Sequence, residues 1–327
     1  MKSKSTIALV LSGIAIAMMT FVCATDRNSV PGLDNGKPAA NNNPSIYSPT
    51  IPDAMDFCGE SVPLDIYYVR EGLDRELIIN TFGHTHTMLY FKRAHRYFPI
   101  IEPILKKNGV PDDFKYLCVI ESGLTNATSP AKAQGFWQFM KATGQKYGLE
   151  ISDEIDMRNN LEAATEAACQ FLKSLKNSLG SWTAAAAAYN CGAGGLTKNM
   201  EKQSISNYYN TRLNNETSRY VYRILAMKQI MQHPQEYGFY LRPCDLYPTL
   251  QTRTATLSGQ NVDIYAFAKA NGCSYKVFRE LNPWITTEKL TNKDNRSYTV
   301  KLPVEGGLSL KKIRTDRDKG TSYITKM

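Results

Sequence analysis

A glutamate that follows four apolar residues is the strongest candidate for acid–base chemistry in this chain. Glu121 comes directly after Leu-Cys-Val-Ile, residues 117–120, at the end of a short predicted helix. A carboxyl group held among apolar groups has its charged form disfavoured, so its pKa rises and it can donate a proton near neutral pH. The alternative interpretation is a solvated carboxylate at a helix end, which is the more common role for this pattern taken alone.

The segment after Glu121 has the composition of a sugar-binding surface. It contains no other carboxylate as far as Gly148, so a second catalytic carboxylate would have to come from elsewhere in the chain. Residues 134–140 combine a glycine, three aromatic rings and Gln138, whose side-chain amide can both donate and accept hydrogen bonds. The rings could stack on sugars, but we expect most of them to fill the core.

Four motifs occur along the chain in a defined order. They are Glu121-Ser122, Gly135-Phe136-Trp137-Gln138-Phe139, Ala188-Tyr189-Asn190-Cys191-Gly192 and Glu216-Thr217-Ser218-Arg219-Tyr220-Val221. Together they resemble the soluble lytic transglycosylase domain, glycoside hydrolase family 23, which has a lysozyme-like helical fold and cleaves peptidoglycan. The resemblance covers roughly residues 57–239, and four ordered motifs are far more specific than any one of them.

The resemblance implies roles for individual residues. It implies that Glu121 is the single catalytic acid and base. It also implies a set of substrate-binding residues, namely Ser122, Ser129, Gln138, Tyr189, Asn190, Glu216 and Tyr220. In the family, the residue corresponding to Ser129 faces the N-acetyl group of the sugar, whereas the last two close the cleft. This chain has Lys132 where a glycine is frequent and Cys191 where an alanine is usual.

The reaction implied by the resemblance needs only one carboxyl group. The acid protonates the oxygen between N-acetylmuramic acid and N-acetylglucosamine, and the N-acetyl group supports the positive charge that develops. The ionised carboxylate then takes a proton from the C6 hydroxyl, which closes a 1,6-anhydro ring. Two alternatives remain open: a hydrolase that uses water, with a distant carboxylate such as Glu216 folded into range, and a non-catalytic wall-binding protein.

The pattern of apolar residues predicts helices over residues 57–240. Steps of three and four relate Leu77, Thr81, His84, Met88, Phe91 and His95. The same steps run through residues 161–179, and Gly180 ends them. Asp112, Ser181 and Ser218 are the predicted starts of three further helices. The fold class predicted is therefore mainly α, a lysozyme-like helical catalytic domain.

After Pro248 the pattern changes to a small α+β module. Residues 252–257 and 298–302 are strand-like, and they enclose two short amphipathic helices at 263–271 and 275–281. This β-α-α-β order resembles a degenerate LysM domain. We expect the module to hold the enzyme on its polymeric substrate, which would leave the helical domain independent of it. In the alternative, the module buttresses the helical domain and Trp284 is buried between them.

The first residues resemble an export signal. Lys2 and Lys4 precede an uncharged stretch, residues 7–22, and Ala24 offers a cleavage site. We therefore expect an exported protein of the periplasm or cell envelope. Attachment to a membrane through the N-terminus is an open alternative, in which lipidation of Cys23 is less favoured because a small residue does not precede that cysteine. The stretch is shorter than the about 20 residues that span a bilayer.

The predicted organisation has five parts. They are a signal peptide (1–24), a disordered linker (25–55), the catalytic domain (56–248), the LysM-like module (249–303) and a basic flexible tail (304–327). The linker is rich in Asn, Pro, Gly and Ser, and the tail is polar and basic.

Composition limits the classes of partner. The chain has 327 residues, of which 43% are hydrophobic and 21% charged, so it is not a wholly disordered or polytopic membrane protein. Its net charge of +9 suits a polyanion, and peptidoglycan glycan strands are the predicted partner. No basic run with interleaved aromatic residues occurs, so we predict no nucleic-acid partner. The oligomeric state is not indicated.

Cysteine and histidine residues do not point to a metal or a cofactor. His84 and His86 are two apart, which on a helix places them on different faces, and no third ligand has suitable spacing. Cys118 and Cys169 lie in apolar helical patterns, and no Cys-X-X-Cys pair occurs. We predict no metal and no cofactor, and disulfide pairing stays open.

Overall fold

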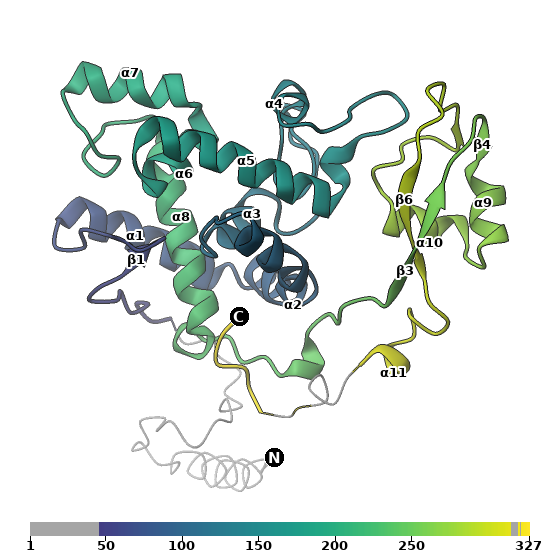
Figure 1. Cartoon of the computed structure of the whole chain (residues 1–327). Helices are drawn as coiled ribbons and strands as arrows, with labels where there is room; N and C mark the ends of the chain where they lie inside the picture. The colour runs from purple at the N-terminus through teal and green to yellow at the C-terminus, as the bar shows by residue number, and fades with distance from the viewer. Residues whose placement is uncertain (1–45, 315–319, 321) are drawn as a thin grey trace, which may run out of the picture. The chain divides into compact units, whose positions relative to one another are not determined.

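A computed structural model describes residues 46–314, 320 and 322–327 (Figure 1). The predicted signal peptide, and the predicted linker up to residue 45, lie outside these residues. None of the helices in the described ranges is long and apolar enough to cross a bilayer. Residues 46–55, which were assigned to a disordered linker, instead contact the body: the Tyr237 hydroxyl donates to the Thr50 carbonyl oxygen at 2.7 Å.

The helical domain confirms the predicted mainly α class. Its helices are α1 (Tyr67–Phe82), α2 (His84–Lys107), α3 (Phe114–Ser122), α4 (Lys141–Lys146), α5 (Leu161–Leu179), α6 (Trp182–Cys191), α7 (Ala193–Gln203) and α8 (Asn215–Gln232). Short 3-10 turns cover Met157–Asn159, Pro234–Tyr237 and Pro243–Asp245, and β1 (Asp56–Phe57) pairs antiparallel with β2 (Glu60–Ser61). The stepping pattern around His84 belongs to two helices that meet at Gly83.

Capping side chains explain where several helices begin. The Ser181 side chain accepts a hydrogen bond from the Ala184 amide, as the sequence predicted. The prediction for α8 was wrong by four residues: Asn214 caps it through the Thr217 amide, so Ser218 lies inside the first turn. Asp112 also does not cap α3, because the residue before that helix is Asp113. Asn, Asp and Ser all favour caps, so adjacent candidates are hard to rank from sequence.

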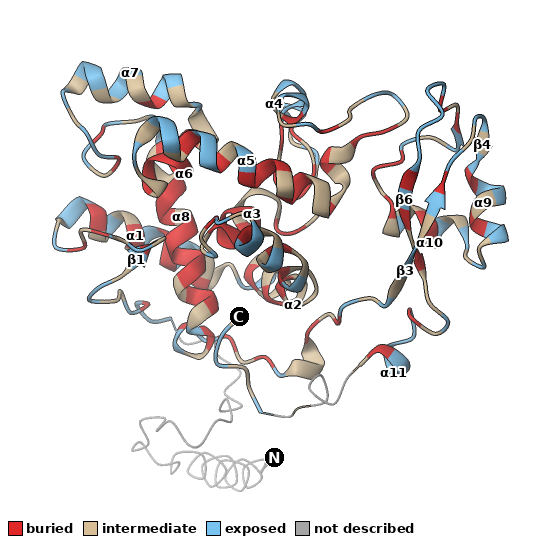
Figure 2. Ribbon diagram, in the orientation of Figure 1, coloured by how far each residue is buried: buried red, intermediate tan, exposed pale blue. Residues whose placement is uncertain are grey.

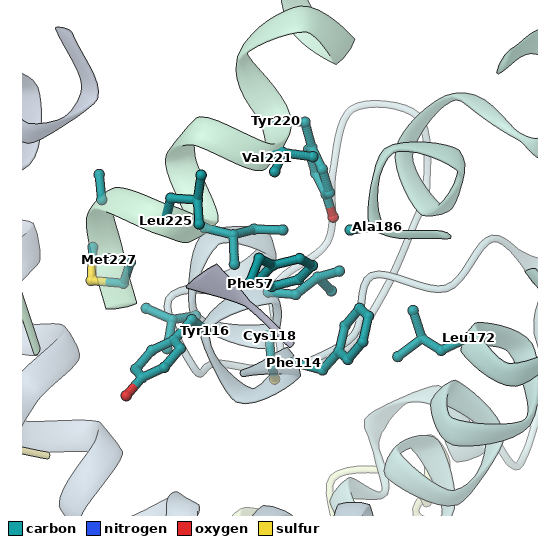
Figure 3. Close-up of a cluster of buried hydrophobic side chains, with 14 of the residues drawn as sticks. Phe57, Phe114, Tyr116, Cys118, Leu172, Ala186, Tyr220, Val221, Leu225 and Met227 are labelled. Carbon is teal, nitrogen blue, oxygen red and sulfur yellow. The ribbon is translucent and has the colours of Figure 1, made fainter. Parts of the chain in front are cut away.

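The core of the domain surrounds α3, which contacts α2 and α8. Five of the nine residues of α3 are apolar and nearly inaccessible: Phe114, Tyr116, Leu117, Cys118 and Val119. Figure 3 shows Phe114 and Cys118 close to Phe57 of β1 and to side chains of α8. The buried faces of α3 and α8 also stand out in Figure 2. The last turn of α3, which carries Glu121, is therefore fixed by packing along the rest of the helix.

The C-terminal module has the predicted β-α-α-β order. Strand β3 (Thr252–Leu257) pairs antiparallel with β6 (Tyr298–Pro303), and between them come α9 (Ile264–Ala270) and α10 (Tyr275–Leu281). A further short pair joins β4 (Val262–Asp263) to β5 (Lys289–Leu290).

The small core of the module includes a residue from the helical domain. Ile155, only 1% exposed, packs in the same cluster as Phe278, Trp284 and Val300. The Asp156 amide donates to the Trp284 carbonyl oxygen at 2.8 Å, and Trp284 itself is 2% exposed. The expectation of a module independent of the helical domain is therefore wrong, and the buttressing alternative fits, because an apolar ring is buried at the junction.

The predicted flexible tail also makes contacts. Helix α11 (Leu310–Ile313) places Ile313 in a buried position. Further on, the Ile324 amide donates to the Leu241 carbonyl oxygen and the Met327 amide to the Met231 carbonyl oxygen, both at 2.8 Å. The tail contains apolar side chains that can be buried, although its overall composition is polar and basic. That composition alone did not predict these contacts.

Candidate active site

Glu121 lies in the last turn of α3, where the chain reverses direction. Gly123 ends the helix in the left-handed conformation with φ 60°, and its amide donates to the Val119 carbonyl oxygen at 2.8 Å. A side chain at Gly123 would place a Cβ 2.7 Å from the Tyr90 ring. Glycine is therefore required at the turn that fixes the direction of the glutamate.

The carboxyl group of Glu121 has the ionisation of an acid poised near neutral pH. Burial is the main cause, and it raises the pKa of Glu121 to about 7 from the ordinary value of 4.5. The hydroxyl of Tyr220 donates a hydrogen bond to Oε1 of Glu121 and opposes that rise, as does the positive charge of Arg223. The carboxylate of Glu216 adds to the rise. The group can therefore be protonated or ionised with little cost at pH 7.

Ser122 and Gln138 fix the loop after α3 through hydrogen bonds to its backbone. The hydroxyl of Ser122 donates to the Phe136 carbonyl oxygen at 2.8 Å. The side-chain nitrogen of Gln138 donates to the carbonyl oxygens of Ala127 and Gly135, at 2.9 and 2.8 Å. The nitrogen therefore already donates twice within the loop. The amide oxygen, which can only accept, is the part of Gln138 that can meet a donor of the substrate.

Ser129 lies in a tight turn of the same loop. Its hydroxyl oxygen accepts from the Ala133 amide at 3.0 Å, and its amide donates to the Ala133 carbonyl oxygen at 2.9 Å. Lys132, which stands at the family's glycine position, has φ 65° in this turn. Within the described residues, Ser129 forms no hydrogen bond to Glu121, so the structure does not join it to the acid.

Tyr189 and Asn190 come from the end of α6. The Tyr189 hydroxyl donates to the Trp137 carbonyl oxygen at 2.7 Å, and burial raises the pKa of Tyr189 well above its ordinary value. The Asn190 side chain donates to Oε1 of Glu216 at 3.3 Å. The structure thus brings four of the predicted site residues together in two pairs, Glu121 with Tyr220 and Asn190 with Glu216, which join α3 and α6 to the same helix, α8.

The aromatic residues of the second motif form part of the core. Phe136, Trp137 and Phe139 are at most 4% exposed, so the core interpretation is confirmed for them. The indole nitrogen of Trp137 donates to the Thr165 hydroxyl at 2.9 Å. Their role is to support the loop rather than to offer faces for sugar stacking.

An internal ion pair supports the loop at Phe139. The guanidinium of Arg158 pairs with the Asp156 carboxylate at 2.6 Å and also donates to the Phe139 carbonyl oxygen at 3.2 Å. A Cβ at Gly135, which has φ 82°, would lie 1.9 Å from the Arg158 carbonyl oxygen. Gly135 is therefore needed for close backbone approach.

Three residues of α2 and α8 that contact the end of α3 were missed by sequence reasoning. Arg223 donates to the Ile120 carbonyl oxygen at 3.1 Å, Arg93 donates to the Gly123 carbonyl oxygen at 3.0 Å, and Tyr90 packs against Gly123. The position of Arg223, three residues after Tyr220 on one helix face, was the available signal.

The histidines and cysteines contribute no metal site within the described ranges. No group of three His, Cys, Asp or Glu residues there is arranged to hold a metal ion. The ring of His86 lies 5.5 Å from the ring of Tyr90, and the ring of His84 lies 6.3 Å from that of Phe82. The six cysteines of this part of the chain are free thiols, and Cys118 and Cys169 are buried as predicted.

Comparison with known families matches both parts of the chain. Residues 98–211 match the family described as Transglycosylase SLT domain. This part of the chain is therefore similar to an SLT domain. Residues 253–306 match the family described as Soluble lytic transglycosylase C-terminal LysM-like domain, so the degenerate LysM resemblance is confirmed as well.

Two curated relatives are informative. Membrane-bound lytic murein transglycosylase D of Escherichia coli K12 is 30% identical over 202 residues, which is 59% of this chain and 44% of the relative. A putative tributyltin chloride resistance protein of Alteromonas sp. M-1 is 32% identical over 110 residues, covering 33% of this chain and 53% of that protein. The chain spans about half the length of the curated relatives it matches.

Proposed function

We propose that this protein is a peptidoglycan lytic transglycosylase in which Glu121 acts first as acid and then as base. The observation that carries the proposal is the partly buried Glu121 carboxyl, with a pKa of about 7 and a hydrogen bond from Tyr220, in a chain that matches the SLT family. A relative named as a lytic murein transglycosylase supports it.

In the first step, protonated Glu121 gives its proton to the glycosidic oxygen between N-acetylmuramic acid and N-acetylglucosamine. The bond from the muramic acid C1 to that oxygen breaks, and the N-acetylglucosamine hydroxyl leaves. The N-acetyl group of the muramic acid stabilises the positive charge at C1, so a nucleophilic carboxylate is not needed. The Tyr220 hydroxyl then stabilises the carboxylate that has formed at Glu121.

In the second step, the C6 hydroxyl of the muramic acid attacks C1, and ionised Glu121 takes its proton. The product ends in a 1,6-anhydro ring and no water is consumed. Because the pKa of Glu121 is about 7, one group can serve both steps at neutral pH.

A hydrolase that uses water is the second candidate, and Glu216 is the observation that favours it. This carboxylate is close enough to raise the pKa of Glu121, although it is exposed and accepts from Asn190. The test is to digest purified peptidoglycan and weigh the products. Anhydro ends, one water lighter than reducing ends, support the transglycosylase, whereas mainly reducing muramic acid would overturn it.

The remaining assignments of the sequence belong to the same proposal. We place the enzyme in the cell envelope, exported by residues 1–24, with the helical domain over 56–248 and the LysM-like module over 249–303. The membrane-bound relative supports an envelope location. Detection of the mature protein in a periplasmic or membrane fraction tests it, and recovery with cytoplasmic markers would contradict it.

A further inference from the structure

Two arginines from different helices converge at the end of α3, beside Glu121. Arg93 of α2 donates to the Gly123 carbonyl oxygen at 3.0 Å, and Arg223 of α8 donates to the Ile120 carbonyl oxygen at 3.1 Å. Both positive charges also act on the Tyr90 hydroxyl, where they oppose the rise in pKa caused by burial. Two guanidinium groups thus share one small region of the surface.

These contacts have a simple structural explanation. The last carbonyl groups of a helix lack partners within the helix, and cations are favourable there because of the helix dipole. That explanation accounts for one hydrogen bond from each arginine. A guanidinium group has five N–H donors, so it leaves most of the donors of Arg93 and Arg223 available.

Arg219, on the same helix α8, has a carboxylate partner of a kind that Arg93 and Arg223 lack among the described residues. Arg219 is matched by the buried carboxylate of Glu76, which accepts two hydrogen bonds from it at 2.7 and 3.2 Å. Neither Arg93 nor Arg223 forms an ion pair with any residue in the described ranges. The charge of Arg223 acts on the pKa of a nearby acidic group, Glu121. Two like charges close together repel each other, and a bound anion would reduce that repulsion.

The position of the pair relates it to the substrate path. Glu216, Tyr220 and Arg223 are spaced at four and three residues, so they share one face of α8. Along this face, Glu216 contacts Asn190, Tyr220 contacts Glu121, and Arg223 contacts the backbone before Glu121. Relative to Glu121, the acidic Glu216 therefore lies toward the start of α8, whereas the basic Arg223 lies toward its end, next to Arg93 of α2.

We propose that Arg93 and Arg223 form a carboxylate-binding site at the basic side of Glu121, and that it takes a free carboxylate of the peptide stem carried by the glycan strand. The proposal rests on the proposed function for the identity of the strand. The sugars offer neutral hydroxyls and amides, so the stem carboxylates are the anions that such a strand brings. A guanidinium fork matches a carboxylate through two parallel hydrogen bonds.

Binding, measured without turnover, tests this site. The protein carries Glu121→Gln to prevent cleavage, and the probes are soluble peptide-bearing glycan fragments, either untreated or with their carboxylates converted to amides. We expect untreated fragments to bind more tightly, on the order of tenfold. Adding Arg93→Gln should bring this ratio close to one, and Arg93→Lys, which keeps the charge without the fork, should give an intermediate ratio.

The matched control is Arg75→Gln, which removes the same charge from an exposed position on α1. It should keep the full ratio. If the arginines only cap α3, Arg93→Gln will lower the melting temperature but leave the ratio unchanged, and the proposal is then wrong. Equal binding of both fragments by the protein without the arginine change also overturns it. Because no cleavage is needed, failure of the proposed function would appear separately, in the product masses.

Discussion

Two glutamate–tyrosine pairs in this molecule have the same chemistry and different surroundings. In the helical domain, the Tyr220 hydroxyl donates to Glu121, which lies against the core and has a pKa raised to about 7. At the junction with the module, the Tyr298 hydroxyl donates to Glu150 at 3.0 Å. The Glu150 side chain is 28% exposed and also pairs with Arg296 at 3.1 Å.

The hydrogen bond from the tyrosine is not the cause of the raised pKa of Glu121. A hydroxyl that donates to a carboxylate favours the ionised form, so it lowers the pKa. What distinguishes Glu121 is the loss of water around it, which outweighs its hydrogen bond. The junction pair keeps its exposure and a cationic partner, which suits it to holding two parts of the fold together.

The largest expected effect comes from Glu121→Gln, which keeps the shape and removes the transferable proton. Activity should fall by roughly 10²-fold or more, the scale of general acid–base catalysis. The measurement is the rate of release of anhydro muropeptides by mass spectrometry. A variant with nearly full activity would show that the acid lies elsewhere, so the difference between the two pairs would not explain catalysis.

The same variant should change stability in a pH-dependent way. The folded pKa of about 7 lies above the ordinary 4.5, so between these values the native state holds a proton that the unfolded state releases. Stability therefore falls as pH rises through that window, by at most about 3 kcal/mol. Glu121→Gln removes this loss, so its melting temperature should exceed that of the unmodified protein more at pH 8 than at pH 4.

The junction is tested by Trp284→Ala. Because Trp284 is 2% exposed and packs with Ile155, the change should cost roughly 3 kcal/mol, typical of a large buried ring, and lower the melting temperature. Tyr265→Ala, at a ring 48% exposed on the same module, is the control and should cost much less. Equal melting temperatures for the two variants would indicate that the module is an independent tether.

Tyr220→Phe separates the two causes that set the pKa of Glu121. Without the hydroxyl the carboxylate loses a stabilising hydrogen bond, so the pKa of Glu121 should rise further. The initial step needs protonated Glu121, so the alkaline fall in kcat/KM should move to higher pH while the maximal rate decreases. A pH–rate profile measures both, and a fall that moves to lower pH would contradict the assignment.

The smallest effect is expected for Glu150→Gln at the second pair. A partly exposed ion pair contributes about 1 kcal/mol or less, so the melting temperature should change little. The pH–rate profile should not move, because Glu150 does not touch the group around Glu121. A displaced profile would mean that the two pairs are coupled and not independent.

Features that form within one short stretch of the chain could be predicted from that stretch alone. The four apolar residues before Glu121 indicated a desolvated carboxyl, and the pattern of Gly180 and Ser181 located a helix end and a helix start. The partner Tyr220 is 99 residues away from Glu121, and only the family resemblance pointed to it.

Other features depended on pairings that no single stretch encodes. Arg93 and Arg223 meet α3 from helices separated by more than a hundred residues, and nothing in their own neighbourhoods marks the meeting point. Whether Trp284 is exposed depends on the backbone of residues 154–156, which belongs to another part of the chain. Burial of a single aromatic ring is therefore a tertiary property, and the sequence left both alternatives open.

The Asp156–Arg158 pair belongs structurally to both parts of the protein. The Asp156 amide contacts the module at Trp284, and its carboxylate holds the guanidinium that supports the loop at Phe139. A chimera that joins this helical domain to the module of a relative would therefore have to exchange residues 150–158 together with the module. The unit of recombination at this junction is therefore larger than the module, because it includes the residues that support the loop at Phe139.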